Sequence, residues 1–354
     1  MELNLTEQVQ KSRSEAAPYP PSYIDRLMRF VERLPVPYWV TYLLLFVLSG
    51  LLNHVLAWLY GVHPAFTFDS ILLTYPLWLW IPLAIVTFLN RTAEGTLETF
   101  RPLLQLDDDS FRKLKVEFTT MPARVVLLNT LFWVVVSVAV FSLFRETFAR
   151  YGFTEGMQKV TLVEGLITYG IGSIIYYHSL RQLWLINRTV KTVKQFNLFA
   201  LDPVYAFSRL TAWTGISWMF MAGMTMLVFP MELASVLVIG YFVVQMVLAI
   251  AAFVLPLQFV SDRLRQEKRR LLAEHQRRVE KTLASLHKAI DQHELSEVGS
   301  FNTAIAVLNS ERALLEKIPT LPWRTDTLTG FLSATGVPIL LFVIQNILRR
   351  WLGD

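Results

Sequence analysis

Few residues of this chain could do chemistry, and the most notable of them are polar side chains inside apolar stretches. Glu164 lies near one end of a hydrophobic segment, where a carboxylate could attract cations or carry a proton. Asn53 and His54 lie in an earlier segment, and a histidine near a glutamate would suit a proton-linked gate. The alternatives are an interfacial Glu164 paired with Arg145 or Lys159, and a neutral His54 that is hydrogen-bonded to a neighbouring helix.

Other polar patterns have structural explanations. The aspartates at 107–109 would point in different directions on a helix, so we interpret them as part of a capped helix start. His287 and Asp291 are one helical turn apart, but the same spacing fits a solvated face. The chain has no cysteine, which excludes thiolate catalysis and disulfides. We therefore expect no catalytic site, no metal site and no cofactor.

Several residues within the apolar segments predict contacts between helices. Gly165, Gly170 and Gly172 recur in one segment and would let a neighbouring helix approach closely. Asn129 and Gln245 lie in two other segments and are most simply explained by hydrogen bonds between helices.

The hydrophobic stretches that must position these residues are about twenty residues long, enough to cross a ~30 Å hydrocarbon core as helices. Charged residues make up only 17% of the chain, against about 25% in soluble domains. The expected membrane segments are residues 38–60, 71–89, 124–144, 159–178, 209–229, 232–256 and 327–348. We predict an all-α, polytopic helical membrane protein with six transmembrane helices and a seventh, C-terminal hydrophobic segment.

The distribution of lysine and arginine predicts the orientation. Twenty-six of these residues fall in segments on one side of the expected membrane domain, and two, Arg145 and Arg150, fall on the other. Positive residues favour the cytoplasmic side, so we predict a cytoplasmic N-terminus in the cell (inner) membrane. The same charges would contact anionic lipids. Because they are divided among separate loops, we do not expect nucleic-acid binding.

The seventh segment has two possible arrangements. If it crosses the membrane, Arg349 and Arg350 lie outside, against the charge rule. Gly336 and Pro338 near its middle could instead support a re-entrant turn, although each arm would be too short to span. We favour crossing and keep the re-entrant form as the alternative.

Residues 23–34 predict an amphipathic helix after a disordered tail. Its apolar face could lie on an anionic membrane surface or pack on the protein itself, and the sequence does not decide between them.

The largest soluble block follows the sixth segment and predicts a helical hairpin. No glycine or proline interrupts residues 258–298, and a second helix is expected at 301–317. Apolar residues at steps of three and four would form its interface. The predicted interface residues are Leu272, Val279, Leu283, Leu286 and Ile290.

These elements divide the chain into four parts. They are a cytoplasmic tail with the amphipathic helix (1–37), a six-helix membrane domain (38–256), a cytoplasmic hairpin (257–324) and a C-terminal segment (325–354). Spans this apolar leave little polar lining within one subunit, so a pathway would form more easily between subunits. We therefore predict a homo-oligomeric, channel-like conduit gated through the extension of the sixth segment. The alternative is a signalling or scaffold protein whose hairpin recruits a partner.

Overall fold

The computed structural model of the chain describes residues 19–193, 198, 201–228, 236–292 and 298–336. The longer elements are α2 (Tyr23–Glu32), α3 (Tyr38–Leu59), α4 (Thr74–Phe100), α5 (Asp108–Thr119), α6 (Ala123–Arg150), α7 (Glu155–Gly172), α8 (Ile174–Lys191), α9 (Asp202–Val228), α10 (Val236–Val254), α11 (Gln258–Asp291) and α12 (Val298–Lys317). Short 3-10 turns η1 (Ser70–Leu73), η2 (Arg101–Leu103) and η4 (Leu255–Leu257) join them, and a further helix covers 325–336. The all-α class is therefore confirmed for these residues.

Five helical stretches in the described ranges are long and apolar enough to cross a membrane, which indicates a membrane protein. They are Tyr38–Leu59, Ser70–Leu103, Ala123–Arg150, Glu155–Lys191 and Val243–Asp291. These stretches match the expected segments one to four and six. The expected fifth segment, α9, is not among them, and hydroxyl side chains such as Thr211, Thr214 and Ser217 reduce its apolar character. Residues 337–348 of the expected seventh segment lie outside the described residues.

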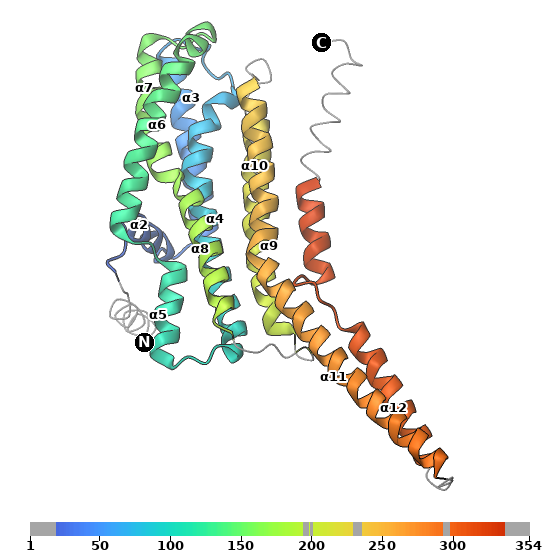
Figure 1. Cartoon of the computed structure of the whole chain (residues 1–354). Coiled ribbons are helices and arrows are strands. Elements are labelled where there is room, and N and C mark those ends of the chain that lie inside the picture. The colour runs from blue at the N-terminus through green and yellow to red at the C-terminus, as the bar shows by residue number, and fades with distance from the viewer. Residues whose placement is uncertain (1–18, 194–197, 199–200, 229–235, 293–297, 337–354) are drawn as a thin grey trace, which may run out of the picture.

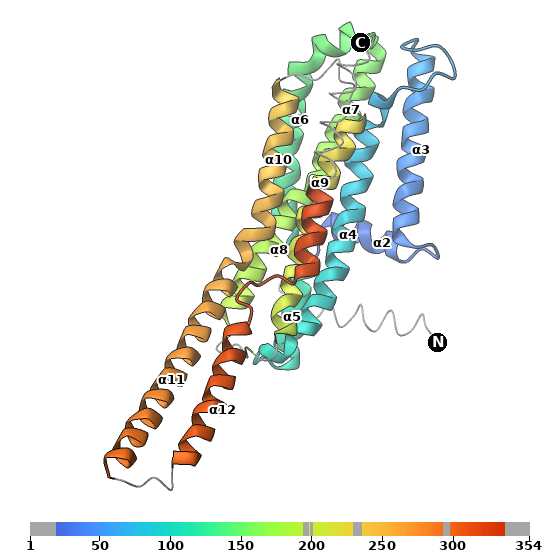
Figure 2. The same cartoon turned by 90° about the vertical axis from the view of Figure 1, so that its right-hand side faces the viewer.

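The helices form an elongated bundle, from which α11 and α12 project at one end (Figure 1). We call this the hairpin end, and we call the other the loop end because the α3–α4 and α6–α7 connections lie there. The central helix is α4, which packs against α3, α7, α8 and α9, and α9 packs in turn against α10. The helix at 325–336 lies at the side of the bundle, next to α10 (Figure 1), and it lies in front of the bundle in Figure 2, where that side faces the viewer.

Two matched turns build the loop end. Gly61 and Gly152 have φ of 68° and 95°, a conformation that glycine adopts without a steric penalty. After Gly61 the amide of Val62 donates to the carbonyl of Ala57, and after Gly152 the amide of Phe153 donates to the carbonyl of Phe148, each over 2.9 Å. These are Schellman turns, and they close the ends of α3 and α6.

The expected fourth segment is two helices rather than one, because the chain breaks at Ser173 between α7 and α8. Gly172 precedes the break, and a Cβ atom there would lie 1.9 Å from the carbonyl oxygen of Trp78 on α4. At Gly165 a Cβ would lie 3.0 Å from the Ser137 hydroxyl on α6. The predicted close approach of helices at these glycines is confirmed.

The apolar face of α2 packs on the protein, which decides between the two sequence alternatives. Ile24, Met28 and Val31 are 0–4% exposed and join the main hydrophobic core. Residues 19–22, expected to be part of a disordered tail, also make defined contacts: the amide of Ser22 donates to the carbonyl of Met121 over 3.2 Å. Residues 1–18 lie outside the described part of the chain.

The α11–α12 pair runs antiparallel. Hydrogen bonds and ion pairs join its two helices, and the short turn η4 connects α11 to α10. The Lys268 ammonium donates to the Glu316 and Ile318 carbonyls, over 2.7 and 2.8 Å, at the end of α12. Further along, Arg278 and His275 lie 3.2 and 3.3 Å from the Glu311 carboxylate. η4 joins α10 to α11, so membrane helix and projecting helix follow each other with a single turn between them.

Candidate functional site

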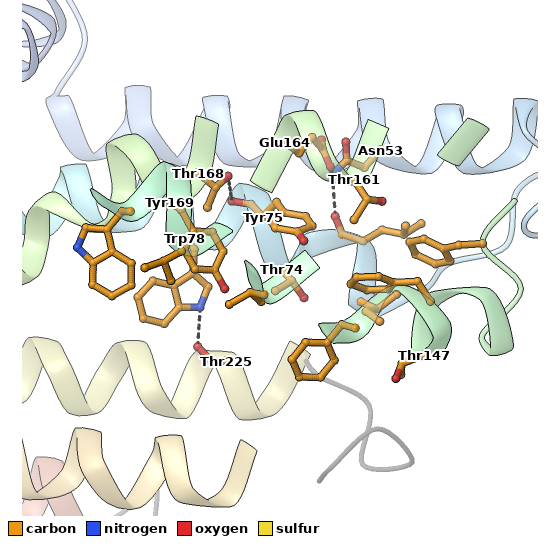
Figure 3. A pocket seen from close by; sticks show the side chains of 18 of the residues that line it. Asn53, Thr74, Tyr75, Trp78, Thr147, Thr161, Glu164, Thr168, Tyr169 and Thr225 are labelled. Carbon is orange, nitrogen blue, oxygen red and sulfur yellow. Dashed lines mark hydrogen bonds between the residues drawn. The ribbon is translucent and has the colours of Figure 1, made fainter. Parts of the chain in front are cut away.

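A cavity of about 430 Å³ lies within the bundle, between α3, α4, α6 and α7, with single residues from α8 and α9. Its walls are mostly apolar and aromatic (Figure 3). The polar and aromatic lining residues used below are Asn53, Thr74, Tyr75, Trp78, Trp133, Glu164, Tyr169, Tyr176 and Thr225. A cavity of this size falls in the range of small-molecule sites.

The part of the cavity nearer the loop end carries a carboxylate and an amide, and Phe148, Phe153 and Met157 line the cavity beyond them. The Asn53 amide nitrogen donates to a Glu164 carboxylate oxygen over 3.2 Å and to the Leu72 carbonyl over 3.0 Å. The side-chain oxygens of Asn53 and Thr74 are buried and have no hydrogen-bond partner among the described residues. Buried polar atoms are normally paired, so these two oxygens leave hydrogen-bonding capacity unused in residues that line the cavity.

The structure gives Glu164 a different partner from those considered in the sequence. Lys159 lies 3.3 Å from Glu155, one turn away on the exposed side of α7, and Glu164 instead accepts a hydrogen bond from Asn53. The amide and the carboxylate therefore meet, although they are 111 residues apart.

His54 lies close in sequence but outside the cavity lining. Its Nδ1 is 2.7 Å from the Gly50 carbonyl of its own helix, and its Nε2 accepts from the Asp69 amide over 3.2 Å. An imidazole that donates at one nitrogen and accepts at the other is neutral. The ring also stacks on Phe68, with centroids 5.1 Å apart. His54 thus holds the α3–α4 connection, and its second partner is a loop amide rather than a neighbouring helix.

The other end of the cavity is aromatic and connects to α9 and α10. The Trp78 indole donates to the Thr225 hydroxyl on α9 over 2.9 Å, and the rings of Trp133 and Tyr176 stack at 5.9 Å. The Gln245 amide on α10 donates to the Tyr176 hydroxyl over 2.6 Å. The predicted interhelical role of Gln245 is confirmed. The predicted interhelical hydrogen bond of Asn129 is likewise confirmed, because its side-chain amide on α6 donates to the Ser173 hydroxyl over 3.1 Å.

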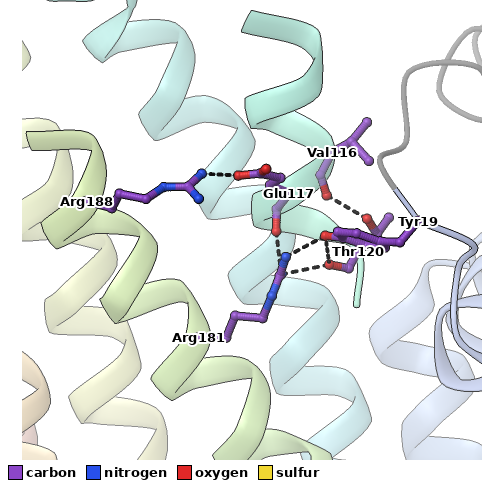
Figure 4. Close-up of polar contacts among 6 residues, drawn as sticks. All are labelled: Tyr19, Val116, Glu117, Thr120, Arg181 and Arg188. Carbon is purple, nitrogen blue, oxygen red and sulfur yellow. Dashed lines mark hydrogen bonds and ion pairs between the residues drawn. The ribbon is translucent and has the colours of Figure 1, made fainter. Parts of the chain in front are cut away.

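A second polar cluster lies nearer the hairpin end and joins the N-terminal residues to α5 and α8 (Figure 4). The Arg181 guanidinium donates to the Glu117 and Thr120 carbonyls and to the Tyr19 hydroxyl. Tyr19 donates in turn to the Thr120 carbonyl over 3.1 Å, and Arg188 pairs with the Glu117 carboxylate. Each of these groups bonds to another protein group, and none of these residues lines the cavity.

Asp25 completes this cluster from α2. One oxygen of its carboxylate accepts from the Ser22 amide, the Ser22 hydroxyl and the Met121 amide, over 2.7–3.1 Å. Burial raises the pKa of Asp25, and the hydrogen bonds from Ser22 and Met121 oppose that rise. We call the cluster the N-terminal clamp; it consists of Tyr19, Ser22, Asp25, Met121 and Arg181.

Nearby, His178 on α8 is fully buried. Its Nε2 lies 2.6 Å from the Asn90 side-chain oxygen on α4. Gln182, one turn along α8, donates to the same oxygen over 3.2 Å and to the Phe118 carbonyl over 2.9 Å. This network fastens α8 to α4 and α5.

The helix at 325–336 has two unlike faces. Phe331 is 3% exposed and stacks on Phe253 of α10, with centroids 4.1 Å apart, and Thr335 is also buried. On the other face Asp326, Thr329 and Ser333 are exposed. These three positions follow helical spacing, so they form one polar stripe.

The predicted hairpin interface residues divide by exposure. Leu272, Val279 and Leu286 are half-buried, whereas Leu283 and Ile290 are 37% and 46% exposed. The deeply buried α11 positions in the hairpin are His275 and Ala289. An interface at Leu283 and Ile290 thus remains a prediction.

Comparison of this chain with protein families, curated proteins and solved structures finds no match. The functional argument therefore depends on the geometry of the chain itself. Sequence reasoning selected Glu164 and Asn53 because they are polar residues in apolar segments. It missed the cavity's aromatic wall, because tryptophan and tyrosine are common in membrane segments and nothing local distinguishes those facing a cavity.

Proposed function

We propose that this chain is a homo-oligomeric membrane conduit rather than an enzyme, with its pathway lined by the polar stripe Asp326, Thr329 and Ser333. In this proposal the N-terminus and the α11–α12 hairpin are cytoplasmic, where basic side chains contact anionic lipids. Six helices cross the membrane, and a seventh segment begins with the helix at 325–336.

The observation that carries the proposal is the exposed polar stripe itself. The helix at 325–336 leads into a strongly apolar sequence, yet its exposed face presents a carboxylate and two hydroxyls. Facing lipid, such groups would be unfavourable, and polar residues in membrane segments normally face protein or water. Several copies arranged around an axis would place this face on a shared aqueous pathway.

A physical connection from the hairpin to this helix supports gating. Ser261 on α11 donates to the Thr320 carbonyl over 3.2 Å, close to the start of the helix at 325–336. Trp323 packs on Phe253 of α10 with ring centroids 5.3 Å apart. A displacement of the hairpin would therefore move α10 and the stripe-bearing helix together.

Cysteine substitution tests the pathway, because the chain has no native cysteine. We expect the Ser333→Cys and Thr329→Cys variants to conduct ions in proteoliposomes as the parent does. A charged thiol reagent should block the ion flux of these two variants. The control is Leu128→Cys on α6, whose side chain is 65% exposed and would face lipid. Absence of flux, or equal block at all three positions, would contradict the proposal.

A second candidate, a signalling or scaffold protein, is favoured by the exposed apolar residues of the hairpin. Leu283, Ile290, Val307 and Leu314 are 37–63% exposed. We expect Leu283→Asp to leave the membrane helices folded and to dissociate the oligomer, with Lys288→Asp as an exposed control on the same helix. Size-exclusion chromatography of the parent and both variants measures the assembly. If the parent is a monomer and shows no ion flux, the scaffold is favoured over the conduit.

A further inference from the structure

We propose that the cavity between α3, α4, α6 and α7 binds a lipophilic amine, with its ammonium group at Glu164 and its apolar body along Trp78 and Tyr169. This site is separate from the polar stripe of the conduit and does not depend on it.

The carboxylate end of the cavity lacks a positive partner. Among the described residues that line it there is no lysine, arginine or histidine, and Glu164 is the single carboxylate. A charge in an apolar environment is unfavourable unless it is paired and hydrogen-bonded. A ligand that brings its own cation would supply the missing pair.

The unused hydrogen-bonding groups also favour an ammonium. The Glu164 carboxylate, the Asn53 side-chain oxygen and the Thr74 hydroxyl all can accept, and the latter two are buried without a partner in the described structure. An ammonium offers up to three donors, whereas an alcohol offers one. Both N–H donors of the Asn53 amide are already used, one by Glu164 and one by the Leu72 carbonyl, so beside Glu164 the amide has only its oxygen left to offer a ligand.

The remainder of the cavity suits an apolar, preferably aromatic, body. Figure 3 shows Trp78 and Tyr169 at the end away from Glu164 and Asn53, with Thr74 between the two ends. A cavity of about 150 Å³ holds a benzene molecule, so about 430 Å³ accommodates an indole or a short chain. Aromatic rings near the bound cation would add to the attraction.

The test compares tryptamine with tryptophol, which have the same indole ring but end in an ammonium or a hydroxyl. Binding of each to the full chain in nanodiscs is measured by titration calorimetry. We expect tryptamine to bind at least about tenfold more tightly than tryptophol, because its ammonium brings a positive charge to a carboxylate that has no cation beside it in the described lining. Glu164→Gln should remove this preference, mainly by weakening the binding of tryptamine.

Two further variants make the result specific to the cavity. Val140→Trp would fill the lumen from α6 and should abolish binding of both compounds. Glu155→Gln removes an exposed carboxylate from the same helix as Glu164 and should change neither affinity. Equal affinities for the two compounds, an unchanged preference in Glu164→Gln, or no tryptamine binding to the parent would each overturn the proposal.

Discussion

The cavity and the N-terminal clamp both place a carboxylate inside the protein, but they use it differently. Asp25 is 2% exposed, and one of its oxygens accepts three hydrogen bonds from Ser22 and Met121. Glu164 is half-buried beside a cavity and accepts a hydrogen bond from Asn53. A buried carboxylate alone therefore does not mark a functional site. A carboxylate that lines a cavity whose described lining residues include no cation is the stronger indication.

The two regions also differ in what surrounds them. At the clamp, Arg29 is the cation close to Asp25, and Arg181 bonds to two backbone carbonyls, so the network holds segments distant in sequence together. At the cavity, the neighbouring groups are apolar rings and unpartnered oxygens. We infer that the clamp contributes to stability and that the cavity contributes to recognition, and the predictions below separate these two contributions.

The largest expected effect is on stability at the clamp. Asp25→Ala removes the acceptor of the buried Ser22 hydroxyl and Met121 amide, whereas the Ser22 amide keeps its hydrogen bond to the Met121 carbonyl. Each buried donor left unsatisfied costs about 1–3 kcal/mol, so we expect the free energy of unfolding to fall by about 2–6 kcal/mol. Thermal unfolding in detergent measures this change. Asp108→Ala, at an exposed ion pair with Arg101, should have almost no effect.

The next effect concerns the wall shared by α4 and α7. Gly172→Ala would place a methyl group 1.9 Å from the Trp78 carbonyl oxygen, so the two helices must separate. Overpacking of this kind costs about 1–3 kcal/mol, and the displaced Trp78 should also weaken tryptamine binding. The control is Gly95→Ala on α4, where a new Cβ meets no atom within 4 Å. If Gly172→Ala were as stable as Gly95→Ala, the close approach of α7 to α4 would be wrong.

These two regions also show which contacts a sequence can predict. Gly172, Asn129 and Gln245 are polar or small residues in apolar helices, and their types alone predict that they contact another helix. The partner of such a residue cannot be predicted in the same way. Tyr19 and Arg181 are hydrogen-bonded although they are 162 residues apart, and no local sequence pattern pairs them. The break at Ser173 was also missed, because residues 159–178 are apolar on average and hydropathy does not report an interruption of the helix.

The pH dependence of stability provides a smaller and more specific test of the clamp. Because burial raises the pKa of Asp25 above 3.8, the folded protein holds this proton more tightly than the unfolded chain does. As the pH rises above about 4, the unfolded chain ionises first, and the free energy of unfolding should therefore fall. Asp25→Asn cannot ionise, so the difference in stability between parent and variant should change over this range. A difference that is constant from pH 4 to 8 would contradict the raised pKa.

The smallest expected effect on stability is at the cavity, and it completes the comparison. Glu164→Gln keeps the size of the side chain and an oxygen that can accept from Asn53, so the hydrogen bond at 3.2 Å can persist. The variant also removes a carboxylate that has no positive partner in the cavity lining, and we expect the free energy of unfolding to change by less than about 1 kcal/mol. The measurement is thermal unfolding of parent and variant side by side, each with and without tryptamine. Tryptamine should stabilise the parent but not the variant, because a ligand stabilises the state that binds it. A large loss of stability without ligand would instead make Glu164 a structural residue like Asp25, and the distinction between the two regions would then fail.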